Sequence, residues 1–362
     1  MMPSRVLMTT DAVGGVWTYA LELTRGLSEL GVEVMLVVLG PPPSPAQRAE
    51  ALEISGLVLV VSHLELEWHD RSGPLSPSAC KRLKRLERVF AADLVHCNGF
   101  REAAAGFTAP VVLAAHSCVR TWWQACRGGA LPADWDAYSL GVRQGIAAAS
   151  RVVAPTAAFL ADLEVAWGPL EQAVVIHNGV DLDATPRPRR RSAVLGAGRL
   201  WDEAKNVGAL CRAAPGLPWP VLLAGEAPPN APKGPASWLG KLARPALTEL
   251  MAGTAIFAAP GRYEPFGLAI LEAAGTGCAL VLSNLPSLLE LWAGAARFVA
   301  PGDEQGLRRE LLDLIDDPES MQRLQLAPRK QAARYTRSHM LGGYSAVYRQ
   351  LLDRADSRAC AA

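Results

Sequence analysis

Short apolar runs alternate with segments of helical periodicity along nearly the whole chain. Residues 5–8 predict a short buried strand, and Gly14 and Gly15 break the chain just after it. Apolar side chains then recur at helical spacing over residues 16–30, and residues 32–39 predict a second buried strand. The same pattern predicts further strands at 57–61, 93–96, 111–115, 152–154 and 174–177, with helices at 78–91, 134–149 and 156–166.

The alternation is interrupted once, between residues 184 and 191. This stretch carries two prolines and a run of arginines, which is typical of an exposed linker between domains. A nucleic-acid contact is the alternative for these arginines, but no aromatic residues are interleaved with them. The alternation then resumes, with strands predicted at 193–197, 220–224, 254–258, 279–282 and 296–299, and helices at 206–213, 267–277, 303–316 and 318–335.

Repeated strand–helix order with fully apolar strands predicts parallel sheets covered on both faces. At 362 residues the chain exceeds ordinary single-domain size. We therefore expect an α/β protein of two doubly wound domains, at 1–184 and 192–337, joined by a linker at 185–191. A last helix is predicted at 338–355. Ligands of open parallel sheets bind beyond the carboxyl ends of the strands, so we expect the functional loops of both domains to face one cleft.

The composition of the chain limits the classes of partner and the cell compartment that we expect for the protein. Half of the residues are hydrophobic and a fifth are charged, which excludes a disordered chain, and the net charge of +1 disfavours nucleic acid. No apolar run reaches membrane-spanning length, so membrane contact is expected to be peripheral at most. The seven cysteines are odd in number and form no C-x-x-C pair, and the first ten residues lack the features of a signal peptide. These features favour a cytoplasmic protein.

The most informative motif follows the apolar strand that ends at residue 259. Glu264 and Glu272 stand eight residues apart, and a helix is expected to start near Gly267 between them. The amides of Phe266, Gly267 and Leu268 would then form a helix N-terminus suited to a phosphate. Two solvated glutamates are the alternative, but the neighbours of Glu272 are apolar, where an unpaired carboxylate is costly.

Two cations follow the first strand of the second domain. Arg199 and Lys205 stand at the mouth of a predicted helix, where they could neutralise a diphosphate and the charge that develops on it as it departs. A surface pair without a ligand is the alternative.

Three other loops follow strands of the first domain. Gly14 and Gly15 suit close approach of the backbone to a ligand, but they also suit a tight turn. Asn178 lies in the word His-Asn-Gly-Val-Asp, which also suits a simple turn. His116 is either a donor-site residue or a hydrogen-bonded structural histidine.

These motifs resemble those of the retaining GT-B glycosyltransferases, family 4 or group 1. The resemblance implies two Rossmann-like domains across a cleft, with the last helix packing back on the first domain. Glu264 would contact hydroxyls of the transferred sugar and Glu272 the nucleotide ribose, and the amides of Phe266, Gly267 and Leu268 would hold the distal phosphate. Arg199 and Lys205 resemble the diphosphate clamp of the family, with a spacing one residue longer than is common and Asn206 in place of glycine.

The resemblance also extends to the first half. It places Gly14 and Gly15 near the donor phosphates and the acceptor, Asn178 on the donor side, and His116 near the sugar. His96 and Asn98 resemble an H-x-H pattern with asparagine in the second place. Outside these motifs, Trp122, Trp123 and Trp135 suit either an acceptor pocket or packing, and packing is favoured. Glu290 resembles a late family position and is interpreted as structural.

The implied activity is transfer of a hexose-type sugar from a nucleoside-diphosphate sugar to an acceptor hydroxyl, with retention of configuration. Glu264, His116, Arg199 and Lys205 are the candidate catalytic residues. No metal or other cofactor is expected, because the resembled family requires none. The acceptor could be a carbohydrate, a small molecule or a lipid-linked sugar. A sugar-nucleotide epimerase, a phosphorylase and a non-catalytic binder of nucleotide sugars are the alternatives, although the lysine signature of a phosphorylase is not seen.

Overall fold

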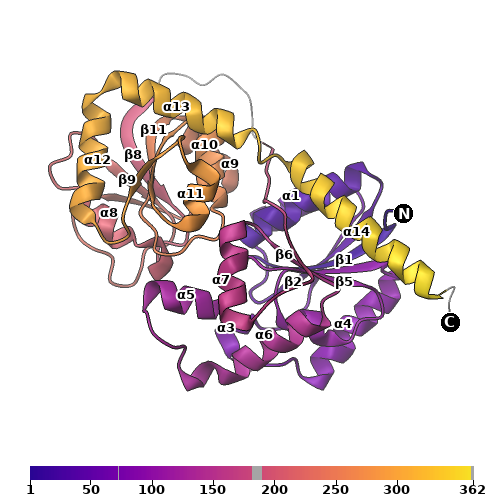
Figure 1. The fold of residues 1–362 in the computed structure, drawn as a ribbon. Coiled ribbons are helices and arrows are strands. Elements are labelled where there is room, and N and C mark those ends of the chain that lie inside the picture. The colour runs from indigo at the N-terminus through magenta and orange to yellow at the C-terminus, as the bar shows by residue number, and fades with distance from the viewer. Residues whose placement is uncertain (72, 182–189, 360–362) are drawn as a thin grey trace. The chain divides into compact units, whose positions relative to one another are not determined.

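The computed structural model describes residues 1–71, 73–181 and 190–359, and its chain divides into two compact units (Figure 1). Unit 1 comprises Met1–Trp123, Gly129–Gly179 and Arg337–Ala362, and unit 2 comprises Gln124–Gly128 and Val180–Thr336. Most of the linker predicted at 185–191 lies outside the described residues.

Unit 1 is built on a parallel sheet with the strand order β3-β2-β1-β4-β5-β6-β7. Its strands are β1 (Arg5–Asp11), β2 (Glu33–Leu39), β3 (Leu57–Val61), β4 (Leu94–Cys97), β5 (Val111–Ala114), β6 (Arg151–Ala154) and β7 (Ala173–Val175). Its helices are α1 (Gly15–Glu29), α2 (Pro45–Leu52), α3 (Glu67–Asp70), α4 (Pro77–Phe90), η1 (Arg101–Ala105), α5 (Val119–Cys126), η2 (Ala133–Trp135), α6 (Asp136–Ala148), α7 (Ala157–Trp167) and α14 (Arg337–Ala359).

Unit 2 repeats this design with the parallel strand order β10-β9-β8-β11-β12-β13. Its strands are β8 (Arg191–Ala197), β9 (Val221–Ala224), β10 (Ser237–Gly240), β11 (Thr254–Ala259), β12 (Ala279–Ser283) and β13 (Arg297–Val299). Its helices are η3 (Glu203–Lys205), α8 (Val207–Ala213), α9 (Arg244–Ala252), α10 (Leu268–Thr276), α11 (Pro286–Trp292), α12 (Glu304–Asp316) and α13 (Pro318–Ala332).

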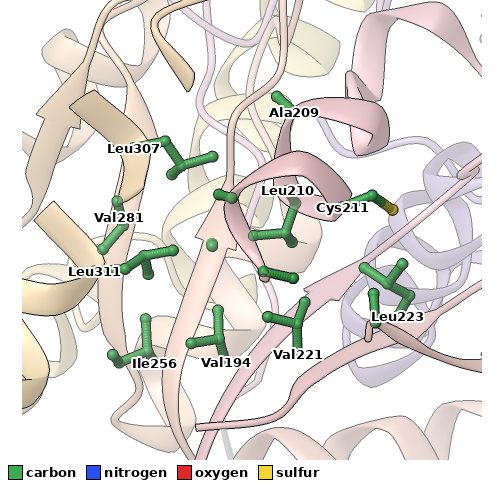
Figure 2. Close-up of a cluster of buried hydrophobic side chains, with 14 of the residues drawn as sticks. Val194, Ala209, Leu210, Cys211, Val221, Leu223, Ile256, Val281, Leu307 and Leu311 are labelled. Atoms are coloured by element: carbon green, nitrogen blue, oxygen red, sulfur yellow. The ribbon is translucent and has the colours of Figure 1, made fainter. Parts of the chain in front are cut away.

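Helices cover both faces of the second sheet, which explains its apolar strands. Successive side chains of a strand point to opposite faces. Val194 therefore packs on one side, in the cluster that Figure 2 shows with Leu210 and Leu307 from the helices, whereas Leu195 packs on the other side with Trp292. The α/β class and the doubly wound parallel sheets predicted from the sequence are confirmed.

Unit 2 differs from the sequence prediction in several places, and neither α9 nor α11 was predicted. Ser237–Gly240 forms an edge strand that the apolar pattern does not reveal, because its side chains are mostly exposed. Arg190, expected in a solvated linker, donates hydrogen bonds to the carbonyls of Thr254 and Thr276, and β8 begins at Arg191. A long side chain at the start of a strand reaches backbone carbonyls that would otherwise be unsatisfied.

The helix predicted at 338–355 is part of α14, which belongs to unit 1 and packs against α1 there. A buried polar group fixes this contact. The ring of His96 on β4 lies 2.7 Å from the hydroxyl of Tyr348 through Nδ1 and 3.2 Å from that of Tyr19 through Nε2. Burial, and secondly the nearby His116, lower the pKa of His96 to about 3, so the ring is neutral. One ring nitrogen then donates and the other accepts, and both are satisfied.

We expect Tyr348→Phe to weaken this anchor, because it leaves one nitrogen of the buried His96 ring without a partner. Such a loss costs about 1–3 kcal/mol of unfolding free energy. Denaturant unfolding of both proteins would measure it. Gln350→Ala, which removes an exposed side chain of the same helix, serves as the control. A Tyr348→Phe variant as stable as this control would contradict the anchor.

Candidate functional site

The strand order of each sheet reverses at one point, and the candidate motifs follow the strands at that point. In unit 2 the reversal lies between β8 and β11, so the loops after Ala197 and Ala259 leave the sheet side by side. In unit 1 it lies between β1 and β4, followed by the loops at 12–14 and 98–100. Such a reversal opens a crevice at the carboxyl ends of the strands, where ligands of these folds bind.

Glu264 and Lys205 come together in unit 2 although 59 residues separate them. The Nζ atom of Lys205 lies 2.5 Å from Oε2 of Glu264, and both side chains are largely buried. The hydroxyl of Ser287 donates to the carbonyl of Glu264 at 2.6 Å and so fixes the backbone of the loop. The pair places a cation and a carboxylate at the ends of β8 and β11.

A hollow lies around this ion pair, with about 510 Å³ of space that includes open solvent. It is bounded by Ala197 at the end of β8, by Gly261 in the loop after β11 and by Ala269 in α10, as well as by Lys205 and Glu264. The charged pair therefore faces space that small groups of a ligand can enter.

The helix after Glu264 begins where the sequence predicts it. Gly267 caps α10 with φ 86°, a left-handed conformation that suits glycine, and α10 begins at Leu268. A Cβ on Gly267 would lie 2.8 Å from the side chain of Ile270, so even small side chains are disfavoured there. The first amides of α10 lack partners within the helix, as at every helix start, and carry its positive end.

Glu272 lies in the second turn of α10 and pairs with a residue that the sequence did not single out. The Nε atom of Arg244, at the start of α9, lies 3.4 Å from Oε1 of Glu272, and both side chains are mostly buried. The carboxylate is therefore compensated among its apolar neighbours. Arg244 carries no motif signal, and only the packing of α9 on α10 reveals it.

Arg199 is the more exposed of the two predicted cations. Its guanidinium lies 3.2 Å from the carboxylate of Asp202 and 5.8 Å from the ring centre of Trp201. Asp202 also accepts from the amide of Ala204 at 2.9 Å, which fixes the turn that leads to Lys205. The structure thus holds both cations on one short loop, but Arg199 does not share the carboxylate of Glu264.

Asn206 shows how this chain accommodates the loss of the family glycine. Its φ is 48°, in the left-handed region that asparagine tolerates better than most residues. Its side-chain amide also donates to the carbonyl of Pro260 at 2.9 Å. Asn206 therefore adopts the left-handed turn, and its side chain connects the loop of Lys205 to the loop that carries Glu264.

Gly14 and Gly15 stand at the start of α1 in unit 1. Gly14 caps the helix with φ −151° and ψ −146°, and Gly15 is its first residue. The carboxylate of Asp11 accepts from the amide of Val13 at 2.8 Å, and Gln47 donates to the carbonyl of Ala12 at 3.0 Å. These bonds fix a tight strand-to-helix turn.

His116 follows β5 and is held by Asn98. The Nδ2 atom of Asn98 donates to the carbonyl of Thr9 at 2.7 Å, so its Oδ1 is the atom that lies 2.8 Å from Nε2 of His116 and accepts. Nε2 therefore carries the hydrogen, and burial lowers the pKa of His116 to about 3, so the ring is neutral. Nδ1 is then an acceptor that makes no hydrogen bond within the described part of the chain, and it is able to accept from a hydroxyl.

The remaining candidates divide between packing and surface. Asn178 is buried next to Gly179, whose amide donates to the sulfur of Met340 in α14. Trp135 is buried against Tyr138 with the guanidinium of Arg71 over its ring, which agrees with a packing role. In contrast, Trp122 and Trp123 are half-buried on α5, and Glu290 is exposed on α11.

Two features are absent from the described part of the chain. No group of three or more histidine, cysteine or acidic side chains in residues 1–71, 73–181 and 190–359 is arranged to hold a metal ion. Over the same residues, no helix has the length and apolar character needed to cross a membrane.

Models of glycosyltransferase families match both halves of the chain. Residues 13–184 match the model for Glycosyltransferase Family 4, and residues 191–317 match the model for Glycosyl transferases group 1. A glycogen synthase of Mycobacterium tuberculosis is 27% identical over 365 residues, covering 88% of this chain and 86% of its own.

Solved structures show the same fold at low identity. A sucrose-phosphate synthase from Thermosynechococcus elongatus superposes with a TM-score of 0.78 at 17% identity, covering 97% of this chain and 100% of its own. The Anabaena protein HepE, solved with UDP and glucose, has the same TM-score, identity and coverage.

The fold, with its two parallel sheets, and the matches to both halves define a GT-B glycosyltransferase. The chain belongs to the family 4 and group 1 glycosyltransferases. Its reaction is therefore the transfer of a sugar from a nucleotide-sugar donor.

The turn at Asn206 gives a prediction about stability. Asn206→Gly keeps the left-handed conformation and loses the bond to Pro260, which costs about 1 kcal/mol. Asn206→Ala also loses this bond and adds the left-handed strain of an ordinary residue, about 1–2 kcal/mol more. Denaturant unfolding should rank alanine below glycine, with exposed Asn284→Ala as the control. The opposite order would show that the left-handed turn does not limit stability.

Proposed function

We propose that the protein is a retaining glycosyltransferase that moves a hexose-type sugar from a nucleoside-diphosphate sugar to an acceptor hydroxyl. The observation that carries the proposal is the Lys205–Glu264 pair at the reversal point of the second sheet, beside the first amides of α10. A diphosphate and a sugar are the ligand groups that a cation and a carboxylate at such a point bind best.

The charge of the leaving group decides the roles in unit 2. Departure of the nucleoside diphosphate leaves negative charge on its distal phosphate, and Arg199, Lys205 and the amides of Phe266, Gly267 and Leu268 would stabilise it. When a phosphate pairs with Lys205 in place of Glu264, the carboxylate of Glu264 becomes available to accept hydrogen bonds from sugar hydroxyls. Glu272, oriented by Arg244, would accept from the ribose.

We propose front-face attack by the acceptor. The bond between C1 of the sugar and the phosphate oxygen breaks, the acceptor oxygen bonds to C1 on the same face, and its proton passes to the departing phosphate. Both electrons of the broken bond stay with the phosphate. This preference over a covalent intermediate rests on the resemblance to the family.

In unit 1, His116 would accept a hydrogen bond from a sugar hydroxyl through Nδ1, which the Asn98 contact leaves as the acceptor nitrogen. Gly14 and Gly15 would admit the donor phosphates and the acceptor to the start of α1. Asn178 is proposed to act on the donor side through its loop.

Uridine nucleotides are the first donors to test, because the Anabaena structures contain UDP, UDP and glucose, or UDP-glucose. We propose a carbohydrate, a small molecule or a lipid-linked sugar as the acceptor, with contact to membranes peripheral at most and no nucleic-acid partner. No metal is proposed for the transfer, because Arg199 and Lys205 supply positive charge at the diphosphate. We place the reaction in the cytoplasm, where nucleotide sugars are made.

Measurements of nucleotide binding and of turnover can test the proposed roles of Arg199 and Glu264. Arg199→Ala should weaken binding of a nucleoside diphosphate about tenfold to a hundredfold, the value of one or two hydrogen bonds to a charged group. Glu264→Gln should lower kcat by about a hundredfold or more while nucleotide affinity changes little. Calorimetry with UDP, GDP, ADP and dTDP, followed by assays with their sugars, would measure both.

Two exposed residues of unit 2, changed as Arg297→Ala and Glu249→Gln, provide matched controls. Normal transfer by Glu264→Gln would overturn the proposed site. Release of an altered sugar nucleotide without any acceptor would instead identify an epimerase, and tight binding without turnover would identify a binding protein.

The stereochemistry provides an independent test. A retaining enzyme gives a product whose anomeric configuration equals that of the donor, and proton NMR of the fresh product reads it from the anomeric coupling constant. Rates should be the same before and after dialysis against EDTA. Inversion would contradict front-face attack, and loss of activity restored by a divalent cation would contradict transfer without metal.

A further inference from the structure

The loop after β4 carries Asn98, and an acid outside the proposed site holds this loop. Glu67, the first residue of α3, accepts from two backbone amides. The amide of Phe100 lies 3.1 Å from Oε2 and 3.2 Å from Oε1 of Glu67, and the amide of Arg101 lies 3.0 Å from Oε2. One carboxyl group therefore fixes two successive residues of the loop.

Buried side chains on η1 support the same loop. Arg101 and Glu102 are 4% and 2% exposed, and the Nε atom of Arg101 lies 3.5 Å from Oε1 of Glu102. The guanidinium of Arg101 also donates to the carbonyl of Glu65 at 2.5 Å, which ties η1 to the segment just before Glu67. The segment that carries Glu67 is thus tied to η1.

Helix α6 blocks the loop from its other side. A Cβ on Gly145 would lie 1.9 Å from the carbonyl oxygen of Phe100, so the helix backbone touches the loop directly. The loop between Glu67 and α6 has little room to move, and Asn98 stands at its start. Asn98 in turn bridges the carbonyl of Thr9 and the ring of His116.

We infer that Glu67 is a positioning residue for sugar transfer: through the amides of Phe100 and Arg101 it orients Asn98, and through Asn98 it holds the ring of His116. The inference rests on the proposed function, because it takes His116 as a ligand contact. The chain Glu67–loop–Asn98–His116 connects α3, β4 and β5 at the carboxyl edge of the first sheet.

The electrostatic surroundings of Glu67 give this chain a pH dependence. Burial, and next the charge of Glu102, raise the pKa of Glu67 to about 8. The other groups that face it are Arg101 on η1, Cys97 on β4 and Tyr138 on α6. Burial raises the pKa of Cys97 and of Tyr138 well above their ordinary values, so both stay neutral.

The direction in which pH changes the folding stability follows from the protons bound in the folded and unfolded states. Between its ordinary pKa of 4.5 and the raised value of about 8, Glu67 holds a proton in the folded protein and not in the unfolded chain. Stability therefore falls as pH rises through this interval. Above pH 8 the carboxylates of Glu67 and Glu102 are both charged and repel, which loosens the loop, whereas a glutamine at position 67 stays neutral and keeps an acceptor oxygen.

The test compares Glu67→Gln and Glu67→Ala with Glu65→Gln, whose exposed side chain lies two residues away and pairs with His69 at the surface. Wild-type kcat/KM should fall about tenfold between pH 7 and pH 9, following the protonated fraction of one group with a pKa near 8. Glu67→Gln should match wild type at pH 7 within about twofold and lose this fall. Glu67→Ala should lower kcat more than it raises the donor KM.

A second readout does not depend on activity. The ring signals of His116, observed by NMR of histidine-labelled protein and assigned by their loss in His116→Ala, should shift in Glu67→Ala and stay near wild type in Glu67→Gln and Glu65→Gln. This shift is expected even if His116 has no part in transfer, so it separates the inference from the proposed function. Unchanged His116 signals in Glu67→Ala, or a fall above pH 8 that persists in Glu67→Gln, would overturn the inference.

Discussion

Burial of both faces of the central strands is the constraint on which the other features depend. Val194 and Leu195, or Ile256 and Phe257, are neighbours on one strand that enter two different apolar cores. Charged groups on such strands would be costly to bury, so they gather where the strands end. Lys205 and Glu264 meet for this reason, although they are remote in sequence.

The two units carry different polar groups at the ends of their buried strands. At its strand ends, unit 2 carries an ion pair and a helix start, an arrangement suited to phosphate and sugar. Besides the carboxylate of Asp11, unit 1 carries neutral groups there: a histidine whose burial removes its charge, an asparagine that sets the tautomer of that histidine, and glycines in a tight turn. Glu67 follows the same pattern, since burial and the charge of Glu102 raise its pKa more than the facing Arg101 lowers it.

The features that could be predicted from the sequence are those that hydrophobic periodicity and motif spacing determine. The apolar strands, the parallel order and the helix start at Gly267 all follow from local patterns. The edge strand at Ser237 was missed because its side chains are mostly exposed and carry no apolar signal. Arg244, Ser287 and Glu67 were missed for another reason: each acts through one contact with a residue far away in sequence, and a single arginine, serine or glutamate has no recognisable spacing. The chemical roles of the predicted site residues remain predictions, and the geometry of the site supports them.

The return of α14 to unit 1 has a consequence for synthesis on the ribosome. The first sheet is complete by Val175, yet His96 meets its partner Tyr348 only when the last helix has emerged. Unit 2, which lies between these segments in the chain, can close its cores first. The earlier domain in the chain is therefore the later one to finish folding, and until then it exposes the side chains of α1 that α14 covers.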